Sequence, residues 1–200
     1  MNPLKSIWGT IISGLVLTVI LLVIFPGDGG DFVQSMERWI HFLSGITWIG
    51  LLYYFNFVQV PAVAAATADT DGPGPAAINK YVAPRALLWF RWAAVVTWLS
   101  GAAYLMSGGA GGVQLSFADA VTLSGSSQAI GIGAWLGTIM LFNVWAIIWP
   151  NQKKILGLVD ATDEEKAKAR PRALMASRTN TLLSIPMLLF MGASSHGMPF

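Results

Sequence analysis

The sequence predicts an all-α integral membrane protein, and three observations carry that prediction: its composition, its long apolar runs, and the placement of its basic residues. Of the 200 residues, 54% are hydrophobic and only 11% are charged, and the mean hydropathy is +0.60. Such values are typical of membrane proteins and not of soluble domains. We expect a single membrane domain, residues 1–200, with five transmembrane helices.

The five predicted helices follow the apolar runs in order. They cover residues 7–25, 38–60, 86–106, 130–149 and 181–195. A helix of about 20 apolar residues crosses a bilayer, and the proline in the short fifth run, Pro186, is tolerated in membrane helices. The first run is followed by PGDGGD, which is not a signal-peptidase site, so a retained helix is expected there.

Basic residues fix the expected orientation. Lys5 precedes the first run, Lys80 and Arg85 lie before the third, and seven lysines and arginines lie between residues 153 and 178. Because loops rich in lysine and arginine stay in the cytoplasm, we expect the N-terminus in the cytoplasm and the C-terminus in the periplasm, across a bacterial inner membrane.

Two helix pairs of the sequence resemble each other at a constant interval of 87 residues. Trp48, Gly50, Phe55 and Asn56 recur as Trp135, Gly137, Phe142 and Asn143, and the PRAL of residues 84–87 recurs at 171–174. We therefore expect two hairpin repeats, residues 36–108 and 123–197, in the same orientation, as in parallel transporter repeats. Residues 1–30 form an extra N-terminal helix outside the duplication.

The absence of cysteine limits the possible chemistry. Without cysteine there is no disulfide, no thiolate metal site and no C-x-x-C-H for covalent haem. Two histidines remain, His41 near the start of the second span and His196 near the end of the fifth. Five crossings place both at the periplasmic face, although the repeat gives neither a histidine counterpart.

Each histidine has a glycine one helical turn away. Gly45 and Trp48 share a helix face with His41, and Gly192 precedes His196 by four residues. Neutral imidazoles bind haem iron, and glycine lets a flat ring approach the backbone. The pair predicts a haem b site ligated by His41 and His196. Two alternatives stay open, namely a bare copper or zinc ion on the same two ligands and purely structural histidines.

Arginines offer further interactions. Arg38, one turn outward from His41, could pair with haem propionates or extend to the membrane interface. Arg91 lies inside the third apolar run, where a charge needs a partner, and its repeat counterpart Arg178 lies three residues before the fifth run. We expect Asn56 and Asn143 to accept their hydrogen bonds.

Two stretches resemble a known family. RWIHFLSGITWIGLLYYFNFVQVP (residues 38–61) and RTNTLLSIPMLLFMGASSH (residues 178–196) are similar to the urate oxidase N-terminal domain, the membrane domain of cytochrome-c-linked bacterial urate hydroxylases. The likeness spans about residues 36–200. In that family a multi-helix membrane domain precedes a c-type cytochrome. The resemblance implies that His41 and His196 stand at haem or redox-site positions. Because C-x-x-C-H is missing, we expect a single-domain member that passes electrons to a separate partner.

Three functions agree with these observations. The first is a haem b electron-transfer protein whose partner is a c-type cytochrome or a larger membrane complex. The second is a non-catalytic transmembrane subunit of a respiratory or oxygenase complex, and the third is a urate-oxidising enzyme. Membrane lipid is an expected partner in each case. Nucleic-acid binding is not supported, because the basic residues lie where topology requires them.

Overall fold

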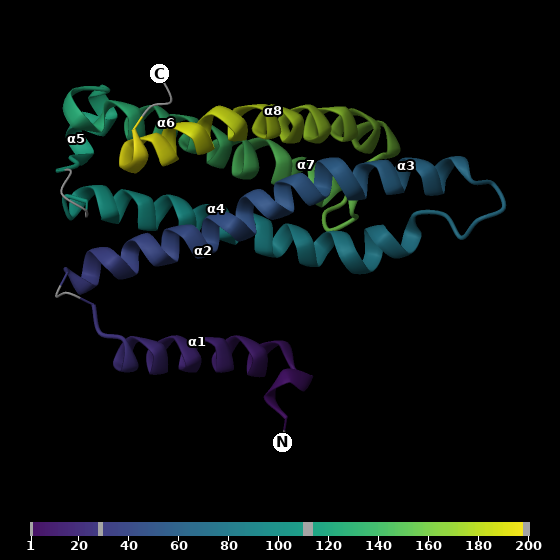
Figure 1. Cartoon of the computed structure of the whole chain (residues 1–200). Coiled ribbons are helices and arrows are strands. Elements are labelled where there is room, and N and C mark those ends of the chain that lie inside the picture. Colours follow the sequence, from purple (N-terminus) through teal and green to yellow (C-terminus); the bar gives the residue numbers. More distant parts are fainter. Residues whose placement is uncertain (1, 28–29, 110–113, 198–200) are drawn as a thin grey trace.

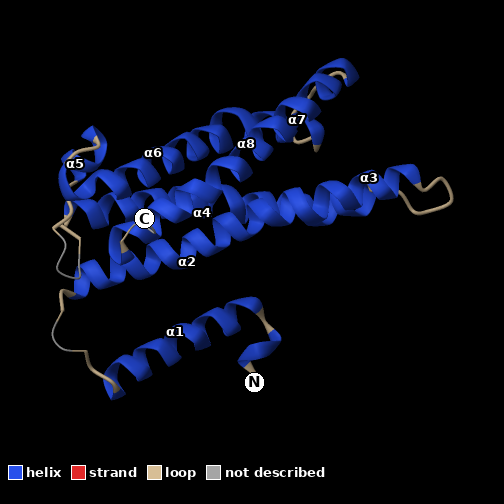
Figure 2. Ribbon diagram, turned by 45° about the horizontal axis from the view of Figure 1, so that its top comes forward, coloured by secondary structure: helices blue, strands red, loops and turns tan. Residues whose placement is uncertain are grey.

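A computed structural model describes residues 2–27, 30–109 and 114–197 of the chain. Throughout these ranges every regular element is a helix (Figures 1 and 2). The all-helical class predicted from the sequence is thus confirmed.

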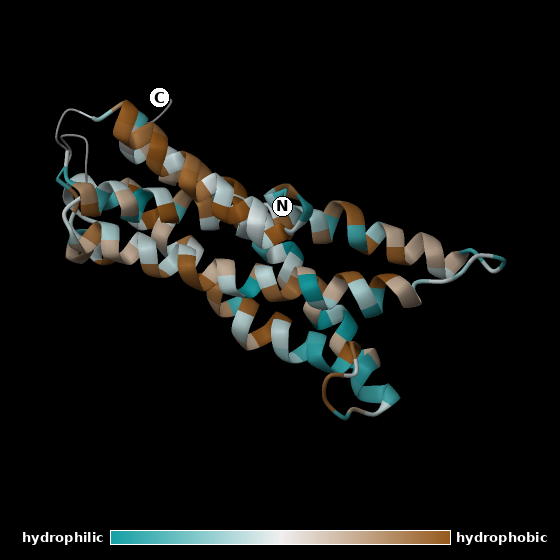
Figure 3. Ribbon diagram, turned by 90° about the horizontal axis from the view of Figure 1, so that it is seen from below, coloured by the Kyte–Doolittle hydropathy of each residue, from teal (hydrophilic) through white to brown (hydrophobic). Residues whose placement is uncertain are grey.

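The N-terminal helix α1 (Ile7–Ile24) stands apart from the other helices (Figure 1). The Ser6 side chain caps it by accepting a hydrogen bond from the Gly9 amide. None of its residues is buried, although its surface is apolar along nearly its whole length (Figure 3). A helix that is apolar on all sides and lacks a protein neighbour needs lipid around it.

A first hairpin follows α1. Helix α2 (Phe32–Tyr54) continues through the π segment η2 (Phe55–Gln59) into α3 (Val60–Ala68). The chain returns through the π segment η3 (Ile78–Val82) into α4 (Ala83–Met106). The first arm is longer than the predicted 38–60 because the Asp31 side chain caps α2 from below that run and the helix continues past Pro61.

A second hairpin has a similar plan. The short helix α5 (Phe117–Thr122) and the 3-10 turn η4 (Gly125–Ser127) lead into α6 (Gln128–Phe142), the π segment η5 (Asn143–Ile148) and α7 (Trp149–Ile155). The sequence predicts a helix end at Pro150, and this is wrong. Pro150, like Pro61, is the second residue after a π segment, where the i→i−4 pattern is already interrupted, so a missing N–H costs less than in a regular helix interior.

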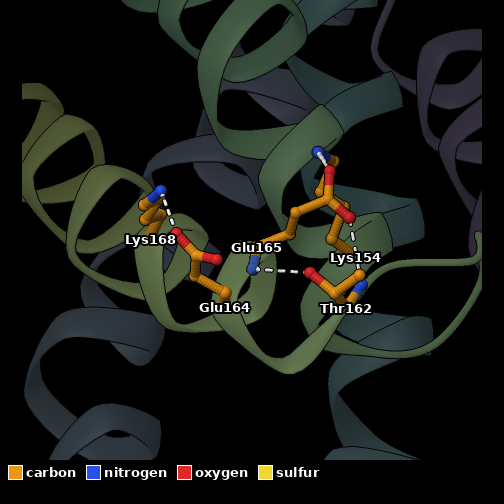
Figure 4. Close-up of polar contacts among 5 residues, drawn as sticks. All are labelled: Lys154, Thr162, Glu164, Glu165 and Lys168. Atoms are coloured by element: carbon orange, nitrogen blue, oxygen red, sulfur yellow. Dashed lines mark hydrogen bonds and ion pairs between the residues drawn. The ribbon is translucent and has the colours of Figure 1, made fainter.

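The return arm α8 (Asp163–His196) joins two predicted elements into one helix. The charged segment after residue 162 and the apolar run 181–195 form a continuous rod that includes Pro171 and Pro186. Its start is fixed by a capping box between Thr162 and Glu165. Lys154 of α7 donates to Glu165 at 2.9 Å, and Lys168 pairs with Glu164 (Figure 4).

Four helical stretches of the described residues are long and apolar enough to cross a membrane. They are Ile7–Ile24, Phe32–Ala68, Ile78–Met106 and Gly125–Ile155. The chain is therefore a membrane protein with several spanning helices. Four of the five predicted spans correspond to these stretches, whereas the fifth, 181–195, forms the end of α8.

The two hairpins pack against each other around a shared core. Its most enclosed apolar side chains include Leu52, Phe90 and Met140, and the rings of Phe55 and Phe90 meet edge to face at 5.3 Å. Polar contacts also join the hairpins: Tyr53 Oη lies 3.0 Å from Ser184 Oγ, and Asn56 Nδ2 donates to Ser177 Oγ at 2.8 Å. From Tyr53 to Asn56 the residue number rises, whereas the number of the contacted residue falls from Ser184 to Ser177. The first arm and α8 are therefore antiparallel.

Candidate functional site

His41 is held between the two arms of the first hairpin. Its Nδ1 lies 2.8 Å from the backbone oxygen of Thr97 on α4. Because a carbonyl oxygen can only accept, Nδ1 carries the proton and donates this hydrogen bond. The remaining nitrogen, Nε2, then holds a free lone pair. An imidazole anchored through Nδ1 to a backbone carbonyl is the arrangement typical of metal-ligating histidines.

A glycine on α4 makes room for this imidazole. A Cβ built at Gly101 would lie 2.8 Å from His41 Cε1 and 2.9 Å from Nδ1, distances that real Cβ atoms do not adopt. Any side chain at 101 would therefore displace the ring. Sequence reasoning missed Gly101 and Thr97. They lie four residues apart on α4 and so share one helix face, which could have indicated that both face His41.

Hydrogen bonds beside His41 further fix the two helices. Thr97 Oγ1 donates to Ser44 Oγ at 3.0 Å and to the Ala93 oxygen at 2.7 Å. Ser44 in turn donates to the Ile40 oxygen at 2.7 Å. The imidazole is thus positioned by a network in which each hydroxyl has a partner, which makes its orientation well defined.

The predicted neighbours of His41 occupy different environments. Gly45 faces α4, since a Cβ there would lie 3.7 Å from Thr97 Cγ2, an ordinary contact distance. Trp48 is only 2% exposed and belongs to the shared core. No acceptor among the described residues reaches its buried Nε1. Trp48 therefore packs in the interior, with one N–H donor still available.

Arg38 is exposed at the start of α2. Nearby, α2 is fastened to the end of α4, because Ser107 Oγ donates to Glu37 Oε2 at 2.6 Å and Gln34 Nε2 donates to the Ser107 oxygen at 2.6 Å. These bonds hold the first turns of α2 in place, while the Arg38 guanidinium stays accessible from outside the bundle.

The second histidine lies at the far end of the chain. His196 is the last residue of α8 and is exposed. A Cβ built at Gly192 would meet no atom within 4 Å, so the helix face there is open. The end of α8 and the start of α2 lie at the same end of the bundle (Figure 1). No interaction between described residues joins His196 to His41.

A bare metal site finds little support in this geometry. Within the described ranges, no group of three or more histidine, cysteine or acidic side chains could surround an ion. Two imidazoles alone leave a copper or zinc ion short of ligands. Haem takes one or two axial ligands from the protein, a number that two histidines can supply.

The buried asparagines do not serve the arginines as expected. Asn143 Nδ2 donates to Asn180 Oδ1 at 2.8 Å, and Asn180 Nδ2 donates to the Met140 oxygen at 3.0 Å. Arg91 instead lies over the ring of Trp149, 3.8 Å from its centroid. Among the described residues, Asn56 donates to Leu52 and Ser177 and no hydrogen bond joins either asparagine to Arg91 or Arg178, so the predicted contacts are not present.

These features define a class of protein: a helical membrane protein with several spanning segments and one histidine clamped between two of them. The family model described as urate oxidase N-terminal matches residues 29–108 and 109–200. The chain therefore belongs to the urate oxidase N-terminal family, as the two quoted stretches indicated. Comparisons with curated proteins and with solved structures give no match.

Proposed function

We propose that this chain is an electron-transfer protein of the inner membrane that holds haem b between His41 and His196. The observation that carries the proposal is the imidazole of His41, whose Nδ1 donates to Thr97 and whose Nε2 is left free. A hydrogen bond to Nδ1 fixes the ring and increases the basicity of the ligating nitrogen. Family membership adds a redox context.

The level of the two histidines supports the same proposal. Tyr53 and Ser184 are in contact across α2 and α8. His41 precedes Tyr53 by twelve residues and His196 follows Ser184 by twelve. Since the helices are antiparallel, both histidines lie about 18 Å from that contact, in the same direction. The open face at Gly192 leaves room there for a flat ring.

The remaining site residues have distinct roles in this proposal. Gly101 keeps the His41 ring in place, Trp48 offers a buried N–H, and exposed Arg38 pairs with a propionate. When bound, haem supplies a one-electron couple that is set by its axial ligands and its burial. The apolar side chains of the bundle would exclude water from such a group, and a c-type cytochrome or a larger membrane complex would be its redox partner.

This function requires a particular topology. We infer that the end of α8 crosses the membrane as a fifth span, with the N-terminus cytoplasmic and the C-terminus periplasmic. The basic residues of the α7–α8 region support that orientation. We further infer that the two hairpins arose by duplication. The repeated order of helix, π segment, proline-containing helix and return helix supports this origin.

An absorption spectrum of the protein purified in detergent tests the proposal. We expect the spectrum of a low-spin haem, which is lost in His41→Ala and in His196→Ala. Gln128→Ala is the matched control, because Gln128 stands 87 residues after His41, and it should retain the spectrum. Protein that is colourless after expression with ample haem would refute the proposal.

Urate oxidation is a second candidate, which the family match favours. Urate added to the purified protein together with an oxidised soluble cytochrome c would then reduce the cytochrome. If the protein carries haem but no urate-dependent reduction occurs, electron transfer without urate oxidation remains the function.

A further inference from the structure

We propose that Arg91 and Lys153, which meet at the ring of Trp149, bind the phosphate of an anionic phospholipid, whose acyl chain lies in the groove between α4 and α6. Arg91 lies about 9 Å along α4 from Thr97, the residue that contacts His41, and Trp149 begins α7. It is independent of the haem proposal.

Two cations approach one indole. Arg91 Cζ lies 3.8 Å from the centroid of the Trp149 ring, and Lys153 Nζ lies 5.9 Å from it. Both side chains are half-buried. A guanidinium carbon at that distance is stacked on the ring, so its N–H donors remain at the edge of the stack. Trp149 thus gathers donors and two positive charges at one place.

No carboxylate among the described residues forms an ion pair with either charge. The ion pairs among the described residues are Lys154–Glu165, Lys166–Asp163 and Lys168–Glu164. Lys154, the neighbour of Lys153, therefore has a carboxylate, whereas Lys153 and Arg91 have none in the described part of the chain. Arg91 Cζ and Lys153 Nζ lie 3.8 Å and 5.9 Å from the same ring centroid, so an anion beside that ring compensates both charges.

The position of Arg91 is fixed by packing. Trp145 Nε1 donates to the backbone oxygen of Arg91 at 3.3 Å. The rings of Trp92 and Trp145 meet edge to face at 5.5 Å. Asn151 and Gln152 follow Trp149 after one proline, so the cluster lies at the boundary between apolar and polar sequence. Lipid phosphates occupy this depth in a bilayer.

An apolar groove lies beside this cluster, because Trp145, whose Nε1 donates to the Arg91 backbone oxygen, is one of its lining residues. Its volume is about 380 Å³, and the side chains that line it are Val95, Trp98, Thr138, Leu141, Phe142, Trp145 and Ala146. On α4, Val95 and Trp98 follow Arg91 at i+4 and i+7, on the same helix face. The groove therefore extends about 10 Å from the cations toward the middle of the membrane.

Charge and shape together select the ligand. A soluble phosphate compound would use the cations but leave the groove empty, whereas a neutral lipid would use the groove but not the cations. An anionic phospholipid uses both. Basic pockets between membrane helices commonly bind anionic headgroups. The half-buried Arg91 and Lys153 therefore make this site prefer anionic over neutral phospholipids.

The test compares lipids retained by the full chain after extraction from vesicles that contain equal amounts of phosphatidylglycerol and phosphatidylcholine. Native mass spectrometry should show phosphatidylglycerol retained several-fold over phosphatidylcholine. In Arg91→Gln/Lys153→Gln the ratio should fall to about one. Lys153→Gln alone should give an intermediate ratio, so the proposal stays testable even if the double variant does not fold. The matched control is Lys80→Gln, because Lys80 lies over a single ring, that of Tyr81, at 5.4 Å, and it should retain the preference.

A second variant tests the groove. Ala146→Trp fills it, so retention of phosphatidylglycerol should fall while the helical circular-dichroism spectrum stays unchanged. An unaltered lipid ratio in the double variant would overturn the proposal. So would a thermal midpoint that inorganic phosphate alone raises as much as phosphatidylglycerol does, because the site would then bind soluble anions.

Discussion

The two hairpins share a plan but use their interiors differently. Each has a helix, a π segment, a proline-containing helix and a long return arm. In the first, an imidazole lies between the arms and contacts Thr97. In the second, two asparagines bond to each other in the interior. Similar backbones thus hold an imidazole bonded to a backbone carbonyl in one hairpin and a pair of hydrogen-bonded asparagines in the other.

Single positions explain the difference. At the interval of 87 residues, Gly101 corresponds to Leu188 and Ala93 corresponds to Asn180. A leucine in place of Gly101 would leave no room for the His41 imidazole, and an alanine in place of Asn180 would offer no hydrogen-bond partner to Asn143. The comparison teaches that small residues on the return arms decide which polar group the interior accepts. Four changes test it, in order of expected effect.

Gly101→Leu makes the first hairpin resemble the second. Its side chain would overlap the His41 ring, and overpacking of this kind costs about 1–3 kcal/mol. Unfolding of the purified protein by denaturing detergent should show that loss, together with loss of any haem. Gly45→Ala, with its Cβ at ordinary contact distance from Thr97, should unfold like the parent. Equal stability of both variants would contradict the described packing of His41.

Asn180→Ala makes the second hairpin resemble the first. It removes the bonds to Asn143 and to the Met140 oxygen and leaves the Asn143 amide without an acceptor. We expect a loss of about 1 kcal/mol in the free energy of unfolding, since hydrogen bonds between membrane helices average about 0.6 kcal/mol and an orphaned donor adds to this. Asn151→Ala, which loses only a bond within its own helix, is the control. A larger effect in the control would refute the importance of the pair.

Tyr53→Phe removes one contact between the hairpins. The lost hydroxyl lies 3.0 Å from Ser184 Oγ, and such a bond is worth about 0.6 kcal/mol. A double-mutant cycle with Ser184→Ala, measured by the same unfolding assay, should give a coupling energy of that size. A coupling energy of zero would mean that the two hydroxyls do not interact.

Glu165→Gln tests the different starts of the return arms, since α4 follows a π segment and α8 begins with a capping box. The Lys154 hydrogen bond and the Thr162 amide lower the pKa of Glu165. The pKa of a glutamate in the unfolded chain is about 4.3. At any pH above this, a lowered pKa in the folded state stabilises the fold, and this stabilisation is lost as the pH falls through the folded-state pKa. The parent should therefore lose slightly more stability than Glu165→Gln between pH 5 and pH 3. Parallel pH profiles would contradict this.

Much of the fold and part of the site could be predicted from local features of the sequence. Apolar runs separated by charged loops predict membrane helices because hydropathy acts along each segment. The helix continuing past Pro150 was missed because the π segment before it leaves no recognised mark on the sequence. Gly101 was missed for another reason: its role depends on an imidazole 60 residues away in the chain.

The sequence by itself determined that this chain is a helical membrane protein of the urate oxidase N-terminal family with two histidines. Only the tertiary structure decided that His41 bonds to Thr97, that Asn143 bonds to Asn180, and that Arg91 stacks on Trp149. The physical reason is that periodicity and hydropathy are properties of one helix. The partner of a buried polar group depends on which helix packs beside it, and at what level.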